Sequence, residues 1–203
     1  MLTFVTLLCY IGIVYAYFGY ALVLYLLTFR KKRLFTELNE RAMPHSITVL
    51  IAVRNEAKVI SSKLENTLAA CRFASSAGYE VEVIVASDCS DDGTDEAVLA
   101  YKEHGVVLVR ASERGGKERA QALALKQARG EIVVFTDAKV ELADDGLVRF
   151  AQHFSDPTVG AVSSIDRVTT DTKEGSGEGF YVRYEMWLRR LESDFNSLVG
   201  LSG

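Results

Sequence analysis

The fold of this chain is decided by residues 116–139, which read GKERAQALALKQARGEIVVFTDAK. A glycine and a lysine begin an amphipathic helical pattern that ends at Gly130, and an apolar strand pattern follows at 132–136. That strand delivers a single carboxylate, Asp137, at its C-terminal end. In an open α/β sheet, ligands bind in the crevice beyond the carboxyl ends of the strands. The stretch therefore predicts a ligand site at this sheet edge, beside a loop that bears a lysine.

The same alternation of strand and helix patterns recurs after residue 45. Strands are predicted at 46–53, 80–86, 106–110, 132–137 and 159–164. Helices are predicted at 58–74, 94–104, 117–128 and 144–154. Strands that alternate with helices of this length indicate right-handed crossovers and a mostly parallel sheet. The predicted fold class is therefore α/β, with the sheet flanked by helices.

The N-terminal stretch, residues 1–29, contains no charged side chain. Because about 20 apolar residues cross a bilayer, and because no basic segment precedes this run, we predict a transmembrane anchor and not a signal peptide. A basic juxtamembrane linker is predicted at 30–45, beginning Arg-Lys-Lys-Arg. Positive charge is retained on the cytoplasmic side, so the N-terminus should lie outside the cell membrane and the rest in the cytoplasm. A last amphipathic pattern at 180–195 has two interpretations, a helix docked on the domain core or one lying against the bilayer.

The composition limits the classes of partner. The chain has 203 residues, 49% of them hydrophobic, which is enough for the core of one domain. Its net charge is −4 and it shows no basic stripe beyond the juxtamembrane cluster, so a nucleic-acid partner is not expected. The three cysteines lack metal-ligand spacing, which agrees with a cytoplasmic chain.

Three polar loops follow successive apolar strands, at 54–56, 87–94 and 136–139. If the strands are parallel, these loops converge on one edge together with the turn at 114–117. Carboxylates, an amide, glycines and a lysine suit a charged, polyhydroxylated ligand, and a helix N-terminus after Gly116 suits a diphosphate. Each feature also has a structural interpretation, since the aspartates at 88–92 are able to form Asx turns and cap the next helix. The glycine patterns of dinucleotide-binding Rossmann enzymes and of P-loops are absent.

Several segments resemble the family-two inverting glycosyltransferases. The segments are TVLIAVRNEAKVI (48–60), VIVASDCSDDGT (83–94), RGGKERAQALALKQARGEIVVFTDA (114–138) and DPTVGAVSS (156–164). A further segment, EGFYVRYEMWLRRLES (178–193), is similar to membrane-bound polysaccharide synthases. The resemblance implies a Rossmann-like GT-A domain over 46–203, incomplete at its C-terminus, and a nucleotide-sugar donor, most often a UDP-sugar.

The resemblance also implies roles for individual residues. Three residues would line the pocket for the base and ribose: Ala52, Asn55 and Glu56. Asp88 would accept a hydrogen bond from the uracil N–H, and Lys117 would lie near the diphosphate. Asp137 would hold a divalent cation, Mg²⁺ or Mn²⁺, that bridges the phosphates of the donor.

Two departures from the family pattern modify these expectations. Lys139 stands at the third position of the D-x-D motif, where an acid is usual. On a strand it would share a face with Asp137, and it would either weaken the metal site or replace the charge of the metal, so metal dependence should be reduced but not absent. The general base and the Q-x-x-R-W acceptor motif are expected beyond Gly203, so this chain alone should not turn over.

The expected function is that of a membrane-anchored inverting glycosyltransferase that transfers a sugar from a nucleotide-sugar to a growing polysaccharide. One alternative is transfer to a polyprenyl-phosphate or glycolipid acceptor. Another is a non-catalytic subunit that only binds a nucleotide-sugar.

Overall fold

The computed structural model describes residues 2–29, 43–164 and 176–195. The chain divides into two compact units. One unit combines Met1–Glu37 with Ala161–Ser202 and holds the helices near the two ends of the chain. The other spans Leu38–Gly160 and holds the sheet.

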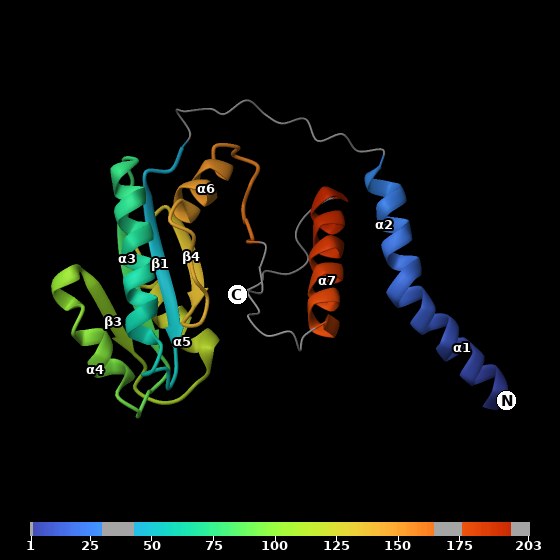
Figure 1. Cartoon of the computed structure of the whole chain (residues 1–203), viewed down its shortest axis with the longest axis horizontal. Helices are drawn as coiled ribbons and strands as arrows, with labels where there is room; N and C mark the ends of the chain where they lie inside the picture. The colour runs from blue at the N-terminus through green and yellow to red at the C-terminus, as the bar shows by residue number, and fades with distance from the viewer. Residues whose placement is uncertain (1, 30–42, 165–175, 196–203) are drawn as a thin grey trace. The chain divides into compact units, whose positions relative to one another are not determined.

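The sheet has four parallel strands in the order β3-β2-β1-β4 (Figure 1). Their bounds are Ser46–Val53 for β1, Glu80–Ser87 for β2, Val106–Arg110 for β3 and Ile132–Asp137 for β4. Ala52 of β1 lies in register with Ala86 of β2 and with Asp137 of β4. The C-terminal ends of these three strands are therefore level, and the α/β prediction is confirmed.

Helices cover both faces of the sheet (Figure 1). They are α3 (Ile60–Ser76), α4 (Thr94–Leu99), the short 3₁₀ helix η3 (Lys102–His104), α5 (Lys117–Leu125) and α6 (Gly146–His153). Successive side chains of a strand point to opposite faces. Thus Val49 and Ile51 of β1 share a buried cluster with residues of α3, α4 and α6, whereas Leu50 shares one with Ala120 and Ala124 of α5.

Some sequence predictions are wrong in detail. Residues 159–164 form no strand, although the apolar pattern there favoured one. A strand needs a hydrogen-bonded neighbour, and an apolar run of this kind does not guarantee one. The helix predicted at 94–104 ends at Leu99 and is followed by the separate helix η3, which Gly105 closes in the left-handed region at φ 82°.

The other unit contains the apolar N-terminal helix and α7 (Ser176–Phe195). Three consecutive helical segments form the apolar helix: α1 (Leu2–Val14), the π-helical turn η1 (Tyr15–Gly19) and α2 (Tyr20–Thr28). From Thr3 to Thr28 it is long and apolar enough to cross a membrane. The helix α7 contacts α2, and the Tyr20 hydroxyl donates to Oε1 of Glu192 at 2.8 Å.

Candidate functional site

A cavity of about 530 Å³ lies at the C-terminal edge of the parallel sheet. The ends of β1, β2 and β4 and the start of α5 line it, which is the position expected of a ligand site in this class of sheet. Its volume lies within the usual range for small-molecule sites. The structure brings six residues singled out in the sequence to its wall: Ala52, Glu56, Asp88, Lys117, Asp137 and Lys139.

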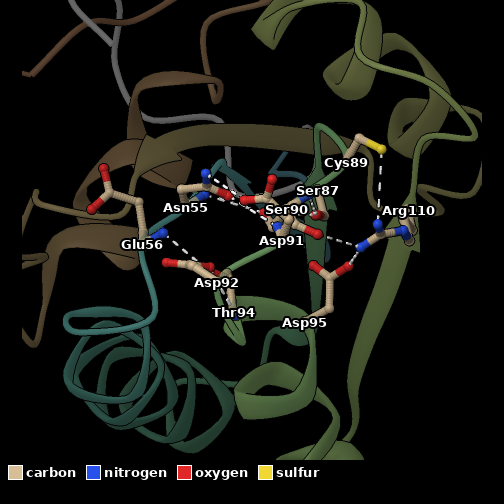
Figure 2. Close-up of polar contacts among 10 residues, drawn as sticks. All are labelled: Asn55, Glu56, Ser87, Cys89, Ser90, Asp91, Asp92, Thr94, Asp95 and Arg110. Atoms are coloured by element: carbon tan, nitrogen blue, oxygen red, sulfur yellow. Dashed lines mark hydrogen bonds and ion pairs between the residues drawn. The ribbon is translucent and has the colours of Figure 1, made fainter.

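Asn55, which the resemblance also placed in the pocket, has a bracing contact (Figure 2). Its Nδ2 donates to Oδ1 of Asp91 at 2.8 Å, and its Oδ1 accepts from the Asp91 backbone N–H at 3.1 Å. Asn55 adopts φ 55°, a left-handed conformation that asparagine tolerates better than most residues. Its side chain therefore joins the loop after β1 to the loop after β2.

The segment after β2 provides partners for three consecutive backbone N–H groups after β1; Figure 2 shows the contacts of Asn55 and Glu56. The N–H groups of residues 55, 56 and 57 donate to Ser90 Oγ at 3.2 Å, Thr94 Oγ1 at 2.8 Å and Asp92 Oδ2 at 3.1 Å. Asp92 also accepts from the Thr94 backbone N–H at 3.0 Å, which closes an Asx turn. The hydrogen bond from the Thr94 hydroxyl is the main reason why the pKa of Asp92 is lowered. The contacts of Asp92 are thus those of a residue that forms an Asx turn, which was the structural alternative to a ligand-binding role.

Arg110, the last residue of β3, holds the same loop from the other side (Figure 2). Its Nη1 donates to the Ser90 carbonyl at 2.9 Å and forms an ion pair with Asp95. Its Nη2 contacts the Cys89 sulfur, and Cys89 itself has φ 58°. The loop after β2 is thus fixed at both sides, which leaves its first aspartate in a defined position.

That aspartate, Asp88, is 4% exposed and positions the turn before α5. Its two carboxylate oxygens accept from the backbone N–H groups of Gly115 at 2.8 Å and Gly116 at 3.0 Å. The hydrogen bond from Gly115 is the main cause that lowers the pKa of Asp88. Gly116 has φ 88°, which favours glycine, and Lys117 follows as the first residue of α5. Asp88 therefore fixes the place from which Lys117 reaches the cavity.

Two ion pairs lie on the cavity wall. Lys117 Nζ is 2.7 Å from Asp137 Oδ1, and Lys139 Nζ is 2.9 Å from Glu56 Oε1. The expectation that Lys139 shares a strand face with Asp137 is wrong, because β4 ends at Asp137. A turn follows, closed by the Val140 N–H donating to the Asp137 carbonyl at 3.2 Å, and it directs Lys139 to the end of β1.

The sequence reasoning missed Lys63, which is 3% exposed on α3. Its Nζ donates to Thr136 Oγ1 at 3.0 Å and to the Val140 carbonyl at 2.5 Å, so it braces both ends of the turn that carries Asp137 and Lys139. Burial lowers the pKa of Lys63 to about 8, although attraction to Asp137 opposes the change. A signal was available: Lys63 lies between Ile60 and Leu64, on the apolar stripe of its helix.

Comparison with known protein families identifies the family of this chain. A model of the family described as Glycosyl transferase family 2 matches residues 48–198, about three quarters of the chain. The chain belongs to glycosyl transferase family 2. This confirms the resemblance in the strand and loop segments and, with the four-stranded parallel sheet, the expected GT-A fold.

The relatives that this chain matches are longer proteins. The poly-β-1,6-N-acetyl-D-glucosamine synthase of Staphylococcus aureus (strain COL) is 33% identical over 125 residues, which are 60% of this chain and 29% of that protein. The synthase of the same name from Staphylococcus epidermidis is 30% identical over 139 residues, 67% of this chain and 32% of its own length. This chain spans about a third of the length of these two relatives.

A solved structure is similar in fold to this chain. The mannosyltransferase from Pyrobaculum calidifontis, in complex with GDP-Man and Mn²⁺, is 36% identical to this chain with a TM-score of 0.64. The match covers 77% of this chain and 46% of that one. A divalent cation therefore occurs with this fold in a related protein.

Proposed function

We propose that the cavity at the C-terminal edge of the sheet binds a nucleotide-sugar donor, in a glycosyltransferase that extends a polysaccharide with inversion at the anomeric carbon. The observation that carries this proposal is the convergence of Asp88, Lys117 and Asp137 on one cavity. The cavity also holds the N-terminus of α5, whose backbone N–H groups and lysine favour an anionic group. The polysaccharide acceptor is supported by the similarity to poly-β-1,6-N-acetyl-D-glucosamine synthases.

Within this proposal the residues have separate tasks. Ala52 and Glu56 border the space for the base and ribose at the end of β1, while Asn55 braces that loop. Asp88 keeps lone pairs beyond those that accept from Gly115 and Gly116, since an ionised carboxylate has about four acceptor sites. It is thus able to accept from the N–H of a uracil. Lys117 lies where the diphosphate would be.

The donor nucleotide is tested by calorimetric titration of the complete 203-residue chain in detergent micelles. We expect saturable binding of UDP, with GDP at least about tenfold weaker, a difference of about 1.4 kcal/mol. GDP bound more tightly than UDP would contradict the choice of nucleotide and favour a guanosine donor, as in the mannosyltransferase complex. If neither nucleotide binds to the folded chain, the donor-site proposal is wrong.

We also infer that the apolar helix from Thr3 to Thr28 anchors the chain in the cell membrane, with the sheet unit in the cytoplasm. Its length and hydropathy support this, as do the basic residues that follow at 30–33. We expect the chain to remain in the membrane pellet after an alkaline carbonate wash. Its release to the supernatant would contradict the anchor.

A further inference from the structure

Two acidic side chains on the cavity wall already have ammonium partners. Lys117 Nζ lies 2.7 Å from Asp137 Oδ1, and Lys139 Nζ lies 2.9 Å from Glu56 Oε1. All four residues line the same cavity. The ammonium groups of Lys117 and Lys139 therefore contact the carboxylate oxygens that a divalent cation would need as ligands.

These residues do not fit a divalent cation. Mg²⁺ and Mn²⁺ prefer several oxygen ligands, of which the protein usually supplies one or two carboxylates. Across the described residues, no group of three or more His, Cys, Asp or Glu side chains is placed to hold a metal. Asp137 is paired with Lys117, and the position of the usual second acid holds Lys139, whose ammonium repels a cation.

A third ammonium lies beneath the same turn. Lys63 is 3% exposed and donates to Thr136 Oγ1 and to the Val140 carbonyl, on either side of Asp137 and Lys139. Solvent screens a buried charge much less than an exposed one. Lys63 therefore places an ammonium beneath this end of the cavity, behind the residues that line it.

The surface lysines are free to change partners at small cost. The Lys117 side chain is 44% exposed and that of Lys139 is 71% exposed. Ion pairs of this exposure contribute about 0–1 kcal/mol. A diphosphate, with more negative charge than a carboxylate, is able to draw both ammonium groups, because each has three N–H donors to share.

We propose that Lys117, Lys139 and the buried Lys63 together neutralise the diphosphate of the donor, so that nucleotide binding requires no divalent cation. This inference rests on the proposed donor site and specifies how that site holds its ligand. The related mannosyltransferase was solved with Mn²⁺, so the inference separates this chain from a protein of the same fold.

The test titrates UDP into the complete chain in detergent, once with EDTA and once with Mn²⁺, and follows Mn²⁺ itself by electron paramagnetic resonance. We expect the two dissociation constants to agree within about twofold, and the free Mn²⁺ signal to be unchanged by the protein. Lys117→Met should weaken UDP binding in EDTA by at least about tenfold. Lys126→Met, at the exposed C-terminal cap of the same helix, is the matched control and should bind as the wild type does.

A second variant makes the metal test stronger. Lys139→Asp restores the usual acid and removes a positive charge. We expect it to bind Mn²⁺ and to bind UDP at least about tenfold more tightly with Mn²⁺ than with EDTA. If the wild type itself needs Mn²⁺ to bind UDP, the lysine inference is overturned and the donor site stands. If no nucleotide binds under either condition, the donor site fails and the inference with it.

Discussion

Asp88→Ala is expected to weaken UDP binding by about a hundredfold or more. The substitution removes a buried carboxylate that accepts from the Gly115 and Gly116 N–H groups. It also releases the turn that places Lys117 on the cavity wall, and it removes the carboxylate proposed to meet the base. Calorimetric titration with UDP measures the loss.

The matched control for this variant is Glu80→Ala. Glu80 begins the same strand that Asp88 follows, at the opposite edge of the sheet, and its side chain is exposed. The Glu80→Ala chain should bind UDP as tightly as the wild type does. Asp88→Asn should give an intermediate affinity, because its amide keeps one acceptor oxygen. Wild-type affinity in a folded Asp88→Ala chain would show that Asp88 has no part in the site.

The ionisation of Asp88 sets the pH range of this effect. Hydrogen bonds from Gly115 and Gly116 lower its pKa below the ordinary value of 3.8. The carboxylate thus stays charged throughout the neutral range, and its contribution is lost only as pH falls through the lowered pKa. The difference between the wild type and Asp88→Ala should therefore be constant near neutral pH.

Lys63→Met is expected to change how the stability of the chain depends on pH. Burial lowers the pKa of Lys63 from 10.5 to about 8 in the folded chain, against the attraction of Asp137 and Glu141. Between these values the unfolded chain binds more protons than the folded chain, so the free energy of unfolding rises with pH. Across that range the wild type should gain about 3 kcal/mol relative to Lys63→Met, since one pKa unit corresponds to about 1.4 kcal/mol.

Urea unfolding, followed by far-ultraviolet circular dichroism at a series of alkaline pH values, measures this difference. The other groups that titrate there are common to both chains, so they cancel in the comparison. Lys58→Met replaces an exposed lysine just before α3 and should run parallel to the wild type. A constant gap between the wild type and Lys63→Met at all pH values would mean that Lys63 is not desolvated as its burial indicates.

The local patterns of the sequence were sufficient for the sheet and for the family. The apolar runs at β1, β3 and β4 predicted strands with the observed bounds, and β2 differs by one residue. The central strand β1 is buried on both faces. The edge strands β3 and β4 expose Val107 and Phe135, and their apolar composition still marks them. Parallel crossovers then bring the loops after β1, β2 and β4 to one edge, which is why Asp88, Lys117 and Asp137 were predicted together.

Patterns that depend on a distant partner could not be interpreted in the same way. Gly130 was taken as the end of a helix, but α5 ends at Leu125. A Cβ at Gly130 would lie 2.4 Å from the Thr48 backbone nitrogen, so the glycine is required by the approach of β1. Asn55 likewise has its partner, Asp91, in another loop.

The sequence by itself determined the α/β sheet, the family and the residues that gather at the sheet edge, because these follow from local hydrophobic periodicity and short motifs. Only the tertiary structure decided the charge pairing in the site. Lys139 meets Glu56 and Lys117 meets Asp137 because β1 and β4 are neighbours and the turn after β4 leaves the strand. Lys63 lies beneath that turn because α3 covers this face of the sheet, a contact that no local pattern specifies.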